Sequence, residues 1–268
     1  MRIPPIPLTN LDFIGYHINQ LVNTMHWLVN REREVSEKNV VKISRERDAE
    51  VAREAILEAA EEVFAREGFD GSRIDIIAAE SGYNKSLIFH YFIDKEGLYR
   101  AVIKRMKMRM NGELLEPLTA FIESSDEMSI HRVRLILEMA IGLYLDYMTS
   151  HPRNLRIMAW ETAEGWVTYL REPAGKESET YRASVFCIAD FLRHAQEADV
   201  ICKEVDVRFV VMNLMNMCSM YLLNLPRFQW FFTEAETDQQ TKLAYIRQQI
   251  VQLVLYGIFT SSQEGIHK

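Results

Sequence analysis

The residues that could do chemistry gather in the stretch 72–95, where polar and cationic side chains recur at helical spacing. Lys85, Ser86 and His90 fall on the outward side of a short predicted helix, and lysine can donate hydrogen bonds to guanine edges and to phosphates. Lys95 lies at the predicted start of the next helix, where a cation and unpaired amides together favour an anion. These residue types and spacings predict contacts to a nucleic acid.

Two short helices joined by a tight turn are needed to position these side chains. Ser72 and Asp75 predict a capping box that starts the first helix, and Gly82 supplies the left-handed backbone conformation that ends it. Asn84 is the predicted N-cap of the second helix. The apolar face of that helix is Leu87, Ile88 and Tyr91. Such a pair is a helix-turn-helix, whose second helix has the dimensions to enter the major groove of DNA.

Five short motifs follow one another in and around this pair of helices. They are Glu67-Gly68-Phe69, Ile77-Ala78, Gly82-Tyr83-Asn84-Lys85, His90-Tyr91-Phe92 and Lys95-Glu96-Gly97-Leu98. Together they resemble the N-terminal DNA-binding domain of TetR-family transcriptional regulators, over residues 48–102. The sequence departs from the family at Leu87, where threonine is common, and at Phe89, where tyrosine is common. Leu87 is therefore not assigned to base reading, and Phe89 lacks the hydroxyl that would face a phosphate.

The expected DNA contacts divide into those that hold the backbone and those that read bases. Ser72, Tyr91 and Lys95 are expected to hold phosphates, which positions the protein without reading sequence. Lys85 is expected to donate to guanine and Phe89 to contact a thymine methyl group, so specificity is expected there. The complete set is Ser72, Arg73, Lys85, Ser86, Phe89, His90, Tyr91 and Lys95.

The distribution of charge agrees with this expectation, although the whole chain has a formal net charge of −7. Between residues 72 and 110 there are eight Lys or Arg and four Asp or Glu, a net +4. From residue 111 to the end there are 14 Lys or Arg and 21 Asp or Glu, a net −7. Phosphate binding depends on the local field more than on total charge. Taken alone, the basic run also fits an ordinary solvated face.

The composition indicates a packed helical protein without catalytic or metal chemistry. Of the 268 residues 48% are hydrophobic, with only 7 Pro and 11 Gly, which argues against a disordered or collagen-like chain. Cys187, Cys202 and Cys218 are odd in number and far apart, which favours reduced thiols in a cytoplasmic protein. The sequence has no HExxH, zinc-type cysteine pair, GxGxxG, P-loop or GxSxG motif. We therefore expect no enzyme activity, no cofactor and no metal site.

Residues 1–44 precede the region of resemblance and are expected to form an N-terminal extension. Three prolines near its start predict an extended arm. An amphipathic helix is predicted next, with apolar residues three and four apart at Leu11, Ile14, Ile18, Leu21, Met25 and Leu28. Polar residues interrupt this stripe, so it is neither a transmembrane span nor a signal peptide. Two interpretations stay open: a helix that docks on the body or a partner, and translated upstream sequence from a misassigned start codon.

Helix after helix is predicted in the rest of the chain, with no strand alternation, so the expected fold is all-α. Residues 48–67 are the first helix of the DNA-binding domain, and residues 95–123 a long helix broken or bent near Pro117. Further helices are predicted over 130–149, 151–166, 178–198, 206–225 and 238–260. The expected domains are the extension over 1–44, a three-helix DNA-binding domain with the helix-turn-helix over 45–102, and a helical effector-binding and dimerisation domain over 103–268.

The helices over 206–225 and 238–260 are apolar over a wider arc than a surface helix needs. In TetR-type proteins the last two helices pair with those of a second subunit as a four-helix bundle, so the resemblance implies a homodimer. A central position in the core of one subunit would explain the same pattern.

Aromatic and methionine residues are frequent in the middle of the chain, and such side chains adapt to varied ligand shapes. A cavity for a small apolar or aromatic effector is predicted there, with Glu161 or Asn213 orienting the ligand. The residues assigned to it are Tyr144, Met158, Trp160, Glu161, Trp166, Phe186 and Asn213. Ordinary core packing is the alternative for each residue on its own.

The resemblance and the residues together predict a ligand-responsive transcriptional regulator in the cytoplasm. We expect a homodimeric repressor that binds a palindromic operator in double-stranded DNA and is released by a small effector, with no membrane association. The alternative is a dimeric helical adaptor or sensor without specific DNA binding. Polar groups at so many outward positions of the helix-turn-helix favour the regulator.

Overall fold

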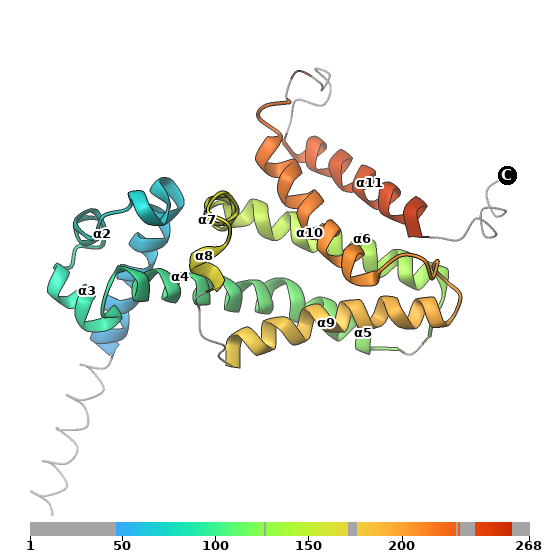
Figure 1. Ribbon diagram of the computed structural model, residues 1–268, viewed down its shortest axis with the longest axis horizontal. Coiled ribbons are helices and arrows are strands. Elements are labelled where there is room, and N and C mark those ends of the chain that lie inside the picture. Colours follow the sequence, from blue (N-terminus) through green and yellow to red (C-terminus); the bar gives the residue numbers. More distant parts are fainter. Residues whose placement is uncertain (1–46, 126, 171–175, 229, 231–238, 259–268) are drawn as a thin grey trace, which may run out of the picture. The chain divides into compact units, whose positions relative to one another are not determined.

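The computed structural model describes residues 47–258, except for residues 126, 171–175, 229 and 231–238 (Figure 1). Within this range the secondary structure is helical and contains no strand, so the all-α prediction is confirmed. Two compact units make up the chain, residues 1–55 and 56–268. The arm and amphipathic helix predicted over residues 1–44 lie outside the described residues.

In the first unit residues 47–55 are helical. Arg53 Nη1 lies 4.0 Å from a carboxylate oxygen of Glu50 and 3.5 Å from one of Glu54. All three side chains reach solvent, and such surface ion pairs contribute little to stability.

The second unit begins with helical residues 56–71, followed by α2 (Ile74–Ser81) and α3 (Lys85–Phe92). Asn84 caps α3 as predicted, because its side chain accepts a hydrogen bond from an amide of the first turn at 2.9 Å. Gly82 follows α2 with a φ of 75°, the left-handed conformation predicted for this turn. The chain therefore forms the predicted helix-turn-helix.

The predicted capping box of Ser72 and Asp75 is wrong. Arg73 is the N-cap of α2, and no side chain caps this helix. The Ser72 hydroxyl instead donates to the carbonyl oxygen of Phe69 at 2.7 Å, and Ser72 is only 3% exposed. The last carbonyl groups of a helix have no partner within it, so they compete with the next helix for a nearby hydroxyl.

A long helical segment leads from the helix-turn-helix into the remaining helices. It consists of α4 (Lys95–Met110), a five-residue π-helix η1 (Asn111–Leu115) and α5 (Glu116–Glu123). The irregularity predicted near Pro117 begins one turn earlier, because the proline ring crowds the carbonyl group four residues before it. The amide of Glu116 bonds to the carbonyl oxygen five residues back, which widens the helix at this point.

The remaining helices are α6 (Ile130–Ser150), α7 (Pro152–Ala163), α8 (Val167–Leu170), α9 (Lys176–Glu197), α10 (Val207–Asn224) and α11 (Gln239–Ile258). Ser129 caps α6 and Asp206 caps α10, each by accepting a hydrogen bond from a backbone amide of the first turn. The helix predicted over 151–166 ends early, because Gly165 and Trp166 take positive φ values of 73° and 63°. α8 begins after this break.

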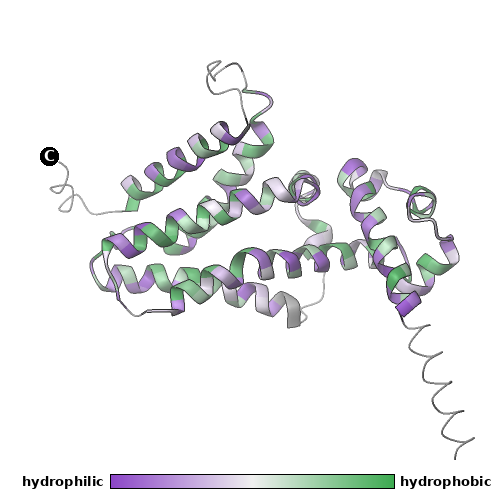
Figure 2. Cartoon of the chain, turned by 180° about the vertical axis from the view of Figure 1, so that it is seen from behind, coloured by the Kyte–Doolittle hydropathy of each residue, from purple (hydrophilic) through white to green (hydrophobic). Residues whose placement is uncertain are grey.

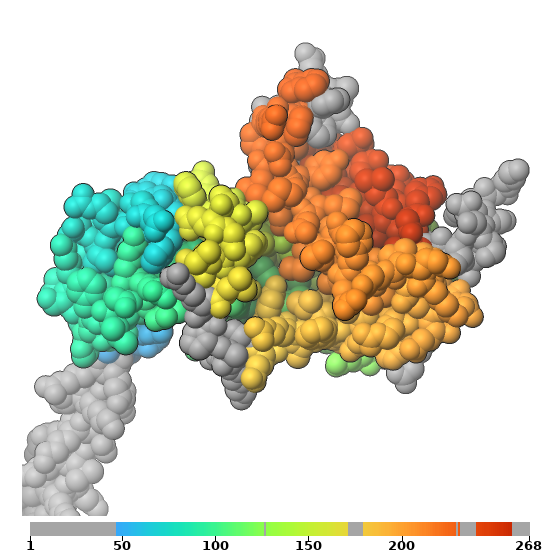
Figure 3. All heavy atoms as spheres, viewed as in Figure 1, coloured from blue at the N-terminus to red at the C-terminus, as the bar shows by residue number. Residues whose placement is uncertain are grey.

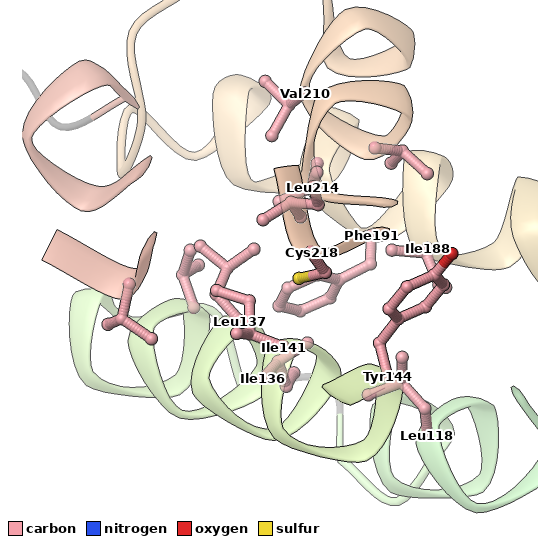
Figure 4. Packing of buried hydrophobic residues seen from close by; sticks show 14 of the residues in the cluster. Leu118, Ile136, Leu137, Ile141, Tyr144, Ile188, Phe191, Val210, Leu214 and Cys218 are labelled. Carbon is pink, nitrogen blue, oxygen red and sulfur yellow. The ribbon is translucent and has the colours of Figure 1, made fainter. Parts of the chain in front are cut away.

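Two hydrophobic clusters stabilise the second unit. One joins residues 56–71, α2, α3 and α4, and it includes Ile157 of α7. The other lies among α5, α6, α9, α10 and α11, and Figure 4 shows its side chains converging from several of these helices. Hydrophobic and hydrophilic residues alternate along the helices in Figure 2, as expected for helices with one buried side. Burial of these apolar sides is the main favourable term in folding.

Candidate nucleic-acid interface and ligand cavity

The outer side of α2 and α3 presents most of the side chains predicted to contact DNA. The exposed members of the set are Arg73, Lys85, Ser86, Phe89 and His90, and the half-buried members are Tyr91 and Lys95. Ile88 and Phe92 are buried and anchor α3 to the core beneath it. Ser72 is the exception, since its buried hydroxyl is bonded to the Phe69 carbonyl oxygen. This correction removes Ser72 from the surface that a phosphate could reach.

An ion pair links the two helices of this surface. The Lys85 ammonium contacts the Asp75 carboxylate, and Arg73 Nη2 lies 3.5 Å from the other carboxylate oxygen. The hydrogen bond from Lys85 is the main cause that lowers the pKa of Asp75, so this carboxylate is ionised at neutral pH. A nucleic acid that binds here must compete with Asp75 for both cations.

Lys95 combines a place at a helix start with contacts inside the protein. Its Nζ donates to the carbonyl oxygen of Asp70 at 3.3 Å and lies 4.7 Å from the centre of the Phe69 ring. The Asp94 side chain caps α4 by accepting a hydrogen bond from the Gly97 amide at 2.6 Å. A phosphate at this helix start would therefore draw Lys95 away from Asp70.

A cavity of about 240 Å³ lies among α4, α6, α7, α8, α9 and α10. Six methionines make up the most frequent residue type in its wall: Met106, Met110, Met158, Met212, Met215 and Met220. Of the residues predicted to line an effector cavity, the structure brings together Tyr144, Met158, Glu161 and Trp166. An apolar wall with a few polar groups is typical of small-molecule sites.

The other three predicted cavity residues lie elsewhere. The indole of Trp160 packs on Gly68 and its Nε1 donates to the Ala65 carbonyl oxygen at 3.3 Å. Figure 3 shows the yellow atoms of α7 and α8 against those of the helix-turn-helix region. Phe186 is 60% exposed on α9, and Asn213 donates to the backbone of its own helix at 2.8 Å. Residue type suggested all three, and none of them is part of the wall of this cavity.

Polar groups in the cavity wall are bonded to one another. The hydroxyls of Tyr144 and Ser219 are 2.7 Å apart, and burial raises the pKa of Tyr144 above its usual range. Lys107 is 9% exposed, and its Nζ lies 3.9 Å from the centre of the Tyr169 ring. The Glu161 carboxylate accepts a hydrogen bond from the Tyr169 amide at 3.1 Å.

The sequence prediction missed Lys107 and Ser219 as cavity residues. Helical spacing carries a signal for both, because Lys107 precedes Met110 by three positions and Ser219 follows Met215 by four. Positions three and four apart share one face of a helix, so polar residues at this spacing from methionines were candidates for the same wall.

Large apolar side chains are exposed along α10 and α11, whose atoms are orange and red in Figure 3. They are Phe209, Met212, Met220, Tyr221, Tyr245, Leu253 and Tyr256. Exposed apolar groups in such number are more than a typical surface helix carries.

In the described part of the chain no group of three or more His, Cys, Asp or Glu side chains is placed to bind a metal ion. None of the helices in that part combines the length and hydropathy required to cross a bilayer.

Two known families match separate parts of the chain. Residues 56–102 match the family described as bacterial regulatory proteins, tetR family, and residues 136–254 match the tetracyclin repressor-like C-terminal domain. The HTH-type transcriptional repressor SCO4008 of Streptomyces coelicolor is 31% identical over 173 residues, which cover 63% of this chain and 79% of the relative. The chain belongs to the TetR family.

Other transcriptional regulators extend the similarity over more of the chain. The HTH-type transcriptional repressor NicS of Pseudomonas putida is 22% identical over 206 residues, covering 75% of this chain and 90% of NicS. The structure of the ketosteroid transcriptional regulator KstR2 of Mycobacterium tuberculosis matches with a TM-score of 0.55 at 16% identity, covering 78% of this chain and 95% of KstR2. The structural match shows a common fold. The chain is therefore a helical, DNA-binding transcriptional regulator.

Proposed function

We propose that this TetR-family protein is a homodimeric repressor that binds a palindromic operator and is released by a small apolar effector. The observation that carries the proposal is that the cavity and the hydrophobic core beneath the DNA-binding helices have side chains in common. Ile103, Met106 and Ile157 line the cavity and also belong to the hydrophobic cluster of the helix-turn-helix region. An effector in the cavity would touch the side chains on which the DNA-binding helices pack.

The DNA side of the proposal assigns α3 to the major groove. The base-reading side chains are Lys85, Ser86, Phe89 and His90, and the phosphate-holding ones are Arg73, Tyr91 and Lys95. The side chains of the first group and of Arg73 are exposed, so a nucleic acid can reach them. Two copies of α3 enter successive major grooves when their centres are about 34 Å apart, so a change in their separation weakens both sets of contacts.

The dimer is supported by the exposed apolar side chains of α10 and α11. Two such helices from each subunit can bury these side chains as a four-helix bundle. In this proposal residues 45–102 bind DNA and residues 103–268 bind the effector and the second subunit.

An apolar effector is supported by the methionine-rich wall of the cavity. FadR of Bacillus subtilis, whose structure is in complex with stearoyl-CoA, has the same fold, with a TM-score of 0.51 and 16% identity over 76% of this chain and 97% of FadR. We assign the protein to the cytoplasm, where bacterial DNA lies, and we assign it neither an enzymatic step nor a cofactor.

The test is selection of binding sites from random duplex DNA by the full-length protein, followed by titration of the selected site. A palindrome with half-sites about 10 base pairs apart is expected. Lys85→Ala should reduce discrimination against scrambled DNA by about 1–3 kcal/mol, whereas Lys203→Ala, the same change outside the helix-turn-helix, should not. Failure to enrich any site would contradict the repressor and favour the adaptor.

A further inference from the structure

Glu161 belongs both to the cavity wall and to the contact with the helix-turn-helix region. It is 1% exposed, and its Oε1 accepts a hydrogen bond from the Tyr99 hydroxyl at 2.7 Å. Tyr99 lies on α4, and its ring packs edge-on against Phe64 and Phe69 with ring centres 4.8 and 5.1 Å apart. Tyr99 therefore joins Glu161 to the aromatic core under the DNA-binding helices.

The backbone after Glu161 is held in a constrained turn that also lines the cavity. The Glu161 carbonyl oxygen accepts from the Trp166 amide at 2.7 Å, and Oε2 accepts from the Tyr169 amide at 3.1 Å. Trp166 has a φ of 63°, a conformation uncommon for a bulky residue. Its ring meets the Tyr169 ring edge-on with centres 5.3 Å apart. A ligand in the cavity would contact the Trp166 and Tyr169 rings, and the backbone amides of both residues donate hydrogen bonds to Glu161.

We propose that Glu161 couples occupancy of the cavity to the DNA-binding helices, and that the effector is a mainly apolar molecule with a neutral hydrogen-bond donor for this carboxylate. The donor, a hydroxyl or an aromatic amine, competes with the Tyr99 hydroxyl for Oε1. The inference rests on the proposed repressor function and adds the coupling residue and the chemical class of the effector.

The chemistry of the carboxylate sets this class. An ionised carboxylate only accepts hydrogen bonds, and bonds to it are stronger than those between neutral groups. Burial and the hydrogen bond to Glu161 raise the pKa of Tyr99 above its usual range, so the phenol stays a donor. A ligand hydroxyl can take its place, whereas an ether oxygen cannot. The Lys107 ammonium already places a positive charge at the Tyr169 ring, which disfavours a cationic ligand.

The first test needs no DNA and uses two probes with the same ring system, 1-naphthol and 1-methoxynaphthalene. Only naphthol has a hydroxyl donor. Tyr99→Phe keeps the ring and vacates Oε1, so naphthol should bind the variant on the order of 10-fold tighter than wild type, as expected for one hydrogen bond to a charged group. Methoxynaphthalene should bind both proteins equally, as measured by probe fluorescence. The proposal is overturned if naphthol binds wild type and Tyr99→Phe with equal affinity, or if Tyr99→Phe tightens methoxynaphthalene as much as naphthol.

Two further variants separate the effect of the Tyr99–Glu161 hydrogen bond from general effects on the cavity. Tyr144→Phe removes a hydroxyl from the same wall, but that hydroxyl is bonded to Ser219, so naphthol binding should not tighten. Glu161→Gln replaces the charged acceptor by a neutral amide of equal size, and the preference for naphthol over methoxynaphthalene should fall toward onefold. Should Tyr99→Phe not fold, a preference that survives in Glu161→Gln overturns the proposal.

The second test measures the coupling to DNA. Saturating naphthol should weaken wild-type binding to the selected operator by on the order of 10-fold, and operator should weaken naphthol binding by the same factor. Tyr99→Phe should bind operator with the coupling factor reduced to about one. If Tyr99→Phe keeps the wild-type coupling factor, the proposed role of Glu161 is overturned, while the proposed repressor function stands. Absence of DNA binding in wild type overturns the proposed function, while the DNA-free test still decides the effector class.

Discussion

Glu61 joins residues 56–71 to α4 through two arginines. Its side chain is 3% exposed, and its carboxylate contacts Arg105 and lies 3.2 Å from Arg109. Glu61→Gln removes the shared negative charge. We expect a loss of about 2–3 kcal/mol in the free energy of unfolding, below the cost of breaking a fully buried pair because both arginines reach solvent. Urea denaturation measures it.

Glu96→Gln is the matched control for this prediction. It breaks an exposed pair with Arg100 one helical turn away, at 3.2 Å, with both side chains more than a third exposed. The expected loss is about 0.5 kcal/mol or less. Equal losses in the two variants would show that burial does not set the contribution of Glu61.

Asp75 places a negative charge on the surface proposed for DNA and holds Lys85. Asp75→Asn should therefore tighten operator binding severalfold, because it removes one negative charge from the surface that meets the phosphates and releases Lys85. Fluorescence anisotropy at constant salt measures this, with Asp146→Asn on α6 as a control of equal charge change. Weaker binding by Asp75→Asn would mean that the ion pair orients Lys85 for its contact.

At the residue scale the sequence predicted which α3 side chains face outward, because helical period alone decides that. It could not predict the place of Ser72 or Trp160. The Ser72 hydroxyl is bonded to the end of the preceding helix, and the Trp160 ring lies on Gly68, 92 positions away in sequence. Both outcomes depend on partners that no local pattern contains.

The start of α10 depends on Asp206, whose side chain accepts hydrogen bonds from the amide and the guanidinium of Arg208 at 2.9 and 2.6 Å. These bonds lower the pKa of Asp206 from 3.8 to about 2. Because the folded pKa is the lower one, the stabilisation is complete above pH 3.8 and is lost as pH falls through about 2.

The pH dependence of α10 is checked by comparing the unfolding free energies of wild type and Asp206→Asn at pH 5 and pH 3. The advantage of wild type should be larger at pH 5. An advantage that is the same at both values would mean that the Asp206 carboxylate has the same pKa in the folded and unfolded chains.

Among the elements, the predicted starts of α6 and α10 at residues 130 and 206 lie within one residue of the observed starts, which Ser129 and Asp206 cap, whereas the π-helix was not predicted. Pro117 signals an irregularity, but the wider turn also depends on Asn111. The Asn111 amide donates to Glu116 at 2.7 Å and accepts from the Ser184 hydroxyl of α9 at 2.9 Å. The second of these hydrogen bonds comes from a helix that is distant in the sequence, so no local pattern contains it.

For the whole molecule, the proposed dimer predicts a sharp effect of charge on α11. Leu253 is 60% exposed in the single chain, and Leu253→Glu would bury a carboxylate in the bundle. We expect this substitution to weaken dimerisation by at least ~2 kcal/mol, about 30-fold, and to weaken operator binding with it. Sedimentation equilibrium measures the dimer.

Phe186→Glu on α9 is the control, since Phe186 is equally exposed at 60% but lies outside α10 and α11. It should leave the dimer intact. A monomeric Phe186→Glu together with a dimeric Leu253→Glu would move the subunit interface from α10 and α11 to α9.

The shared wall of the cavity also constrains how this regulator can diverge. Ile103, Met106 and Ile157 are subject to two selective pressures, because a change that suits a new effector also repacks the core of the DNA-binding helices. Met158 and Met215 line the same cavity but pack with the other cluster. Descendants with new ligand preferences should therefore accumulate substitutions at the second pair while the first three positions change slowly.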